Sequence, residues 1–258
     1  MSSTGPETLF SLSGLNVTNT LLTTLLVDIV IVALVIAVRR RMSLAPGKLQ
    51  AAVESVVEYL RGIVEQVAGG RTNLIFPWVA VFFIYITLSN LIGLFPGFGP
   101  IGFYTGKPWW GFLYLRLPEV PLLHVNTADL NATLALAIVS VIATNVIAIR
   151  TVGLGTYLRR FFALNPLLLF VGLLELLQEL TKFVTFSFRL FGNISAGEAV
   201  LGTMSSLLAF IVPIPFLAFE LLVALIQGLV FALLTMAFMT MLTEHADVPG
   251  GSAHHKEE

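Results

Sequence analysis

The chain has 258 residues, of which 57% are hydrophobic and only 11% are charged, with a net charge of −1. A soluble domain usually carries about 25% charged residues, so this composition excludes a soluble protein, and the charge gives no sign of nucleic-acid binding. The absence of cysteine excludes disulfides and thiolate chemistry. The four histidines lack metal-ligand spacing, so we expect no metal and no other cofactor. Long apolar runs, rather than alternating strands of about ten residues, predict an all-α polytopic membrane protein.

The first predicted crossing, residues 19–38, ends directly before Arg39, Arg40 and Arg41. Basic residues concentrate on the cytoplasmic side of membrane proteins, so the N-terminus is predicted to lie outside. The segment 47–68 has apolar residues at helical spacing on one face and glutamates on the other. This pattern predicts an amphipathic helix on the cytoplasmic membrane surface, although a helix packed on a soluble partner would show it too.

The middle of the chain predicts two further crossings, residues 74–95 running outward and 128–150 running back, joined by an outer loop at 96–127. Asp129 stands just before the second of these apolar runs, where an aspartate typically caps a helix. Asp28, in the middle of the first crossing, is expected to pair with another subunit or helix, because a charge inside a span is costly.

The last third predicts a hairpin of two long helices, residues 166–212 and 215–243, with a turn at a Pro-Ile-Pro sequence. A helix of more than forty residues would be roughly 65 Å long, whereas the hydrocarbon core is only about 30 Å thick. The first arm must therefore lie steeply tilted or be broken, for instance near Gly192 or Gly197. The whole chain is predicted as one membrane domain with five crossings, one surface helix and a polar cytoplasmic tail at 244–258.

Ionisable residues inside the hairpin are the candidate functional groups, because charges within spans are expensive and usually functional. A guanidinium keeps its proton, so Arg189 can hold a fixed charge but cannot carry a proton. Carboxyl groups can take up and release protons, and Glu198 and Glu220 are expected near the outer end of the hairpin. Gln227 shares a face of the second arm with Glu220. Two polar paths separated by an arginine do not make a channel, so a proton would have to cross on a moving carrier.

Simpler interpretations exist for each of these residues. Arg189 would equally suit a structural ion pair with a glutamate of this chain or contacts with backbone carbonyls. Near the cytoplasmic end of the first arm, Glu175, Glu179 and Lys182 would simply reach the interface. On a regular helix these three lie on one face with Arg189 and Asn193, within about 80°.

Several motifs resemble the subunit a family of F-type ATP synthases, of bacterial type. SFRLFGNISAGE at 187–198 resembles the family's hallmark, and AFELLVALIQGLVFALLT at 218–235 is similar to its last helix. TADLNATLALA at 127–137 and LSNLIGLFPG at 88–97 resemble two further family helices. The resemblance covers most of the chain from about residue 75 onward, in the family's order.

The resemblance implies a role for each matched residue. Arg189 would face the carboxylates of a rotating ring and separate two half-channels. The outer proton path would be lined by Asn90, Glu198, Glu220 and Gln227. The cytoplasmic side would include Asn193, Glu175, Glu179, Thr185 and Lys182. Where some relatives have histidine this chain has Glu220, and which of Glu198 and Glu220 gives up the proton last stays open.

The expected function is therefore proton translocation by the stator of a rotary ATP synthase, without catalysis by this chain alone, since it has no GxxxxGK[ST] motif. The resemblance implies a ring of proteolipid c subunits, peripheral-stalk b subunits, the rest of the synthase and lipid as partners. The arginine-rich inner loops favour a bacterial plasma membrane. A secondary transporter would need repeats or discontinuous helices; a channel and a structural anchor are the other rivals. The choice between H⁺ and Na⁺ lies with the ring.

Overall fold

The computed structural model describes residues 8–12, 15–40, 42, 47–94, 102–103, 120–121, 125–161, 166–207 and 213–244. Most of these residues are helical. The helices are α1 (Asn19–Arg40), α2 (Lys48–Ala68), α3 (Thr72–Gly93), α4 (Leu130–Val152), α5 (Leu154–Phe161), α6 (Pro166–Leu207) and α7 (Pro213–Glu244). Two short antiparallel pairs accompany them, β1 (Thr8–Leu12) with β2 (Leu15–Thr18), and β3 (Gly102–Phe103) with β4 (Val120–Pro121). Single 3-10 turns lie at Gly69–Arg71 and Asn126–Ala128.

The all-α polytopic membrane class predicted from the sequence is confirmed. Within the described residues, four helical stretches are long and apolar enough to cross a membrane: Asn19–Arg40, Lys48–Gly93, Leu130–Val152 and Ile214–Thr243. The first arm of the predicted hairpin, α6, is not among them, and it carries five charged residues: Glu175, Glu179, Lys182, Arg189 and Glu198. The number of crossings therefore stays a prediction. The predicted tail, apart from Glu244, lies outside the described residues, as does most of the predicted outer loop.

The ends of α4 show how local sequence sets the helix boundaries. The predicted cap is confirmed: the Asp129 side chain accepts a hydrogen bond of 2.9 Å from the backbone N–H of Asn131. At the other end, Gly153 adopts a φ of +86°, a conformation that suits glycine. The chain then turns into α5, a helix that the sequence did not predict. The Tyr157 hydroxyl donates a 2.5 Å hydrogen bond to Asn145 Oδ1 and ties α5 to α4.

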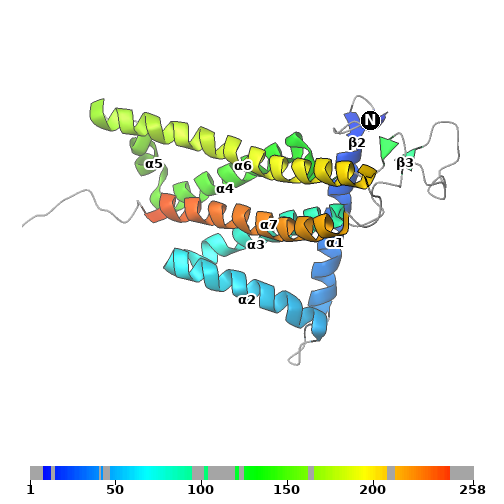
Figure 1. Cartoon of the computed structure of the whole chain (residues 1–258). Helices are drawn as coiled ribbons and strands as arrows, with labels where there is room; N and C mark the ends of the chain where they lie inside the picture. Colours follow the sequence, from blue (N-terminus) through cyan, green and yellow to red (C-terminus); the bar gives the residue numbers. More distant parts are fainter. Residues whose placement is uncertain are drawn as a thin grey trace, which may run out of the picture.

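The hairpin of α6 and α7 organises the molecule (Figure 1). Its two helices run side by side in opposite directions, α3 packs along α7, and α4 packs against both. The helix α6 is continuous over 42 residues, so it is not broken at Gly192 or Gly197. The view in Figure 1 shows α1 running across the direction of α6 and α7. Since α1 is about 33 Å long, it suits an upright crossing, and α6 and α7 would then be strongly tilted.

Aromatic side chains from three helices fill the centre of the bundle. Phe231 of α7 lies 4.9 Å from Phe186 of α6 and 5.5 Å from Phe82 of α3, measured between ring centroids. A hydrogen bond of 2.8 Å between the hydroxyls of Ser140 and Thr235 joins α4 to α7 in the same interior. Because apolar burial gives little drive between helices in lipid, such close packing and polar bonds are what fix the hairpin against α3 and α4.

Candidate functional site

The two predicted outer-path carboxyl groups lie where α6 and α7 approach closely. Glu220 of α7 is only 7% exposed and packs against Gly197 of α6, the residue directly before Glu198. A Cβ atom on Gly197 would lie 2.5 Å from Glu220 Oε1. Glycine at this position therefore makes room for a carboxyl group between the two helices.

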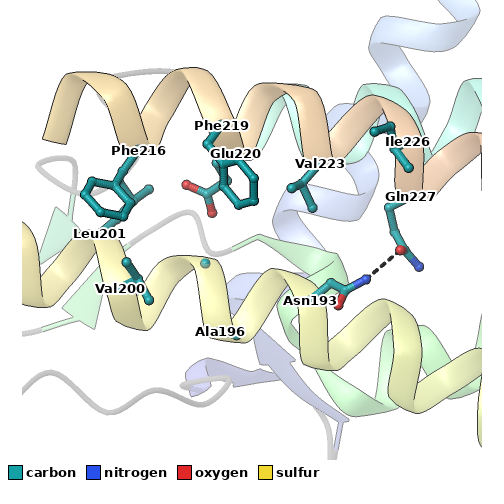
Figure 2. Close-up of a pocket in the computed structure, with 11 residues that line it drawn as sticks. Asn193, Ala196, Val200, Leu201, Phe216, Phe219, Glu220, Val223, Ile226 and Gln227 are labelled. Carbon is teal, nitrogen blue, oxygen red and sulfur yellow. Dashed lines mark hydrogen bonds between the residues drawn. The ribbon is translucent and has the colours of Figure 1, made fainter.

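A direct hydrogen bond joins the arms of the hairpin one to two turns further in. Asn193 Nδ2 donates to Gln227 Oε1 at 2.7 Å, as Figure 2 shows. Both residues line a cavity of about 500 Å³ between α6 and α7, whose wall also includes Glu220. The sequence analysis grouped Asn193 with the cytoplasmic residues, and in the structure it bonds to Gln227 and lines the same cavity as Glu220.

A second, smaller cavity of about 120 Å³ lies on the other side of Glu220, between α3, α6 and α7. Asn90 of α3, Glu198 of α6 and Glu220 of α7 contribute its polar wall. Glu220 thus borders both cavities, whereas Glu198 borders only the smaller one. Three segments that are far apart in the sequence bring their predicted outer-path residues to one place.

Buried polar atoms at these cavities lack hydrogen-bond partners within the part of the chain that the structure describes. They are Asn90 Nδ2, Glu220 Oε2 and Gln227 Nε2. Buried polar groups are nearly always hydrogen-bonded in proteins, and each of these residues lines at least one cavity. Such atoms suit contact with water, which can relay a proton between them.

The side-chain oxygen of Asn90 belongs to a hydrogen-bonded group of residues that the sequence analysis did not include in the site. Thr127 Oγ1 donates a 2.6 Å hydrogen bond to Asn90 Oδ1. The neighbouring Asn126 bonds to the hydroxyl of Ser89 and, through Nδ2 at 3.1 Å, to that of Tyr85. The sequence signal for this group was the run of polar residues just before the Asp129 cap. The start of one helix can bring such side chains against the end of a neighbouring helix.

Arg189 of α6 stands apart from the carboxyl groups. It comes nine positions before Glu198 in the sequence, which is about 13.5 Å along a helix. Its side chain is half-buried. No ion pair or hydrogen bond links it to any residue in the described ranges. The structure therefore does not show the internal ion pair that was the simpler interpretation.

Four of the five predicted cytoplasmic residues lie on α6 before Arg189 in the sequence. Lys182 Nζ forms an ion pair with Glu179 Oε1 at 2.7 Å and lies 4.2 Å from the centre of the Phe238 ring of α7. Glu175 is half-buried with an interaction of its own, and Thr185 is exposed. None of these side chains lines either of the two cavities described above, so Arg189 lies along α6 between them and the two carboxyl groups.

The Gly197→Ala substitution tests whether this close approach matters. We expect proton pumping to fall several-fold while the protein still inserts and assembles, because the new methyl group must displace the Glu220 carboxyl. ATP-driven quenching of a pH-sensitive dye in membrane vesicles measures this. Gly202→Ala, also on α6, is the matched control, since a Cβ there meets nothing within 4 Å. Equal pumping by both variants would show that the Gly197 contact has no functional role.

The fold and site define a helical, multi-pass membrane protein whose buried ionisable side chains lie inside a long hairpin. A family model for the ATP synthase A chain matches residues 20–240. The chain is 29% identical to ATP synthase subunit a of Moorella thermoacetica over 91% of its own length and 94% of that protein. It is 32% identical to ATP synthase subunit a of Citrifermentans bemidjiense, with 86% of each chain covered. The corresponding Vibrio vulnificus protein is 34% identical over 81% of this chain and 77% of its own.

The chain belongs to the ATP synthase A chain family. Membership places it among the multi-pass membrane subunits of bacterial ATP synthases, which take part in proton transport and ATP synthesis.

Proposed function

We propose that this chain is the stationary subunit that leads protons to and from the carboxyl groups of a rotating ring, through two half-channels separated by Arg189. The observation that carries the proposal is the position of Arg189. It is half-buried in an apolar helix without an ion-pair partner in the described residues. A cation in a membrane helix is costly unless an anion faces it, and a ring carboxylate would supply that anion.

The outer half-channel would follow the two cavities. Protons would enter by Asn90 and Glu198 at the smaller cavity, pass to Glu220, and continue along the larger cavity past Gln227 and Asn193. Of the two carboxyl groups, only Glu220 lines both cavities, which supports its role as the last carboxyl group before the ring. In this proposal Glu220, and not Glu198, gives up the proton last.

The step at the ring would depend on charge. A ring carboxyl that receives a proton becomes neutral and can enter lipid, where a charged group is strongly disfavoured. When it returns to Arg189, Coulomb attraction favours the ionised carboxylate, and the proton leaves. A fixed guanidinium also repels a proton that would otherwise cross directly, which separates this mechanism from a channel.

The cytoplasmic half-channel would lie along the part of α6 that precedes Arg189 in the sequence. This part carries Glu175, Glu179, Lys182 and Thr185. Glu175 and Glu179 would both line this path, and Glu179 forms an ion pair with Lys182. Each charge that moves through 100 mV supplies about 2.3 kcal/mol, so several protons must pass for each ATP. The proposed topology has the N-terminus outside and the C-terminus in the cytoplasm, with peripheral-stalk b subunits as further partners.

A cross-linking experiment tests the ring contact. The chain has no cysteine, so single cysteines can be placed at Ala196, which is exposed on α6 beside Asn193, and at Ile142, which is 57% exposed on α4. In membranes that hold the complete synthase with cysteines in the ring subunit, we expect ring cross-links from Ala196→Cys only. Ring cross-links from Ile142→Cys alone, or from neither variant in an assembled complex, would contradict the proposed face.

A further inference from the structure

The 3-10 turn that precedes α4 is held against the C-terminal end of α3 by two kinds of contact. Its first residue, Asn126, is only 1% exposed and accepts a hydrogen bond from the Ser89 hydroxyl. The same amide donates a 3.1 Å hydrogen bond to the hydroxyl of Tyr85. Directly before the turn, Val125 packs on Gly93, where a Cβ atom would lie 2.5 Å from Val125 Cγ2. A side chain at residue 93 would therefore push the turn away from α3.

This anchored turn brings Thr127 against Asn90 of α3. Thr127 is fully buried, and its hydroxyl donates the 2.6 Å hydrogen bond to Asn90 Oδ1. The two ends of an asparagine amide differ, because Oδ1 only accepts hydrogen bonds and Nδ2 only donates them. Asn90 Nδ2 is buried without a partner in the described residues, and Asn90 lines the smaller cavity. The bond from Thr127 therefore leaves the amide with its N–H groups available to that cavity.

A hydrogen-bond donor suits the other polar residues of the smaller cavity. Glu198 and Glu220 line the same space, and an ionised carboxylate only accepts hydrogen bonds. If the amide were reversed, Asn90 Oδ1 would set one acceptor against another. A water molecule that accepts a hydrogen bond from Asn90 Nδ2 is held through its oxygen, so its own protons can point towards a carboxylate. This is the orientation that delivery of a proton to the carboxyl groups requires.

We propose that Thr127 and Asn126 are positioning residues of the outer proton path, and that they act by fixing the orientation of the Asn90 amide. Thr127 holds the amide directly, and Asn126 holds the turn that carries Thr127. Neither of the two lines either cavity, so they act through Asn90 and not on the transferred proton. The inference rests on the proposed function, because it assigns both residues a role in that path.

Proton pumping by the complete synthase in membrane vesicles tests the role of the hydroxyl. Thr127→Val keeps the shape of the side chain but removes its hydroxyl, and we expect pumping per assembled complex to fall about tenfold, as for one lost hydrogen bond. Thr127→Ser retains the hydroxyl and should pump at close to the normal rate. Thr133→Val is the matched control, because Thr133 is also buried near the start of α4 but its hydroxyl bonds to the backbone oxygen of Leu130. Normal pumping by Thr127→Val, or an equal loss with Thr127→Ser, would overturn the inference.

A double-mutant cycle shows whether the two residues act through Asn90. Asn90→Leu should also lower pumping about tenfold, and Asn126→Leu alone should lower it several-fold. In the Asn90→Leu background, neither Thr127→Val nor Asn126→Leu should cause a further loss. Equal losses in both backgrounds would mean that the residues act independently of Asn90 and would overturn this inference alone. Normal pumping by Asn90→Leu would overturn the proposed outer path together with it, so the two failures are distinguishable.

Electron cryo-microscopy of the wild-type synthase tests the inference without relying on the assembly of any variant. At a resolution that shows ordered water, we expect a water molecule within hydrogen-bond distance of Asn90 Nδ2, between this atom and the carboxyl group of Glu198 or Glu220. In the Thr127→Val synthase this water should be lost or displaced. A dry cavity beside Asn90 in the wild type, or water at the same place in both proteins, would overturn the inference.

Discussion

Arg189→Ala is expected to abolish ATP-driven proton pumping while the synthase still assembles. At 4 Å and an effective dielectric constant of about 20, a guanidinium attracts a carboxylate by about 4 kcal/mol. Loss of that attraction would favour the protonated ring carboxyl by about a thousandfold, so its proton would not be released. Dye quenching in inverted membrane vesicles measures pumping, and passive proton leak through membranes stripped of the catalytic sector is measured beside it.

Two further variants sharpen this test. Arg189→Lys should also fail, because an ammonium group is a compact point charge that can lose its proton when buried. Arg150→Ala removes an exposed arginine from the last turn of α4 and should pump normally. Vigorous pumping by Arg189→Ala in an assembled complex would make this arginine a structural charge and would reopen the transporter and channel interpretations.

Glu220→Gln should have the second largest effect, a loss of pumping of about a hundredfold, as for other essential proton-transfer groups. Glutamine keeps the size and polarity of the side chain but cannot carry a proton between the two cavities. Glu198→Gln should reduce pumping only several-fold, because Glu198 borders the smaller cavity alone and water there can take its place. Pumping rates of reconstituted or vesicle-bound synthase, normalised to the amount of this subunit, measure both variants. A larger loss with Glu198→Gln than with Glu220→Gln would reverse the proposed order of the outer path.

The all-α fold class and the candidate functional residues could be predicted from the sequence because both depend on local chemistry. Long apolar runs must be helical in lipid, where every backbone polar group needs an internal partner. The cost of charge in a membrane singles out Arg189, Glu198 and Glu220 without knowledge of their neighbours. The cap at Asp129 is equally local, because its hydrogen bond spans two residues. By contrast, α5 escaped prediction, since its start depends on the positive φ of Gly153.

The partners of these residues were decided by the tertiary structure alone. The resemblance grouped Asn193 with the cytoplasmic residues, and the hydrogen bond of Asn193 to Gln227 on the other arm of the hairpin could not be read from the sequence. The two cavities, and the position of Glu220 between them, require α3, α6 and α7 to meet. The sequence by itself determined which side chains can hold or carry charge. Which of them lie together follows from the register of packed helices, because a contact between distant segments depends on the fit of whole helical faces and not on local sequence.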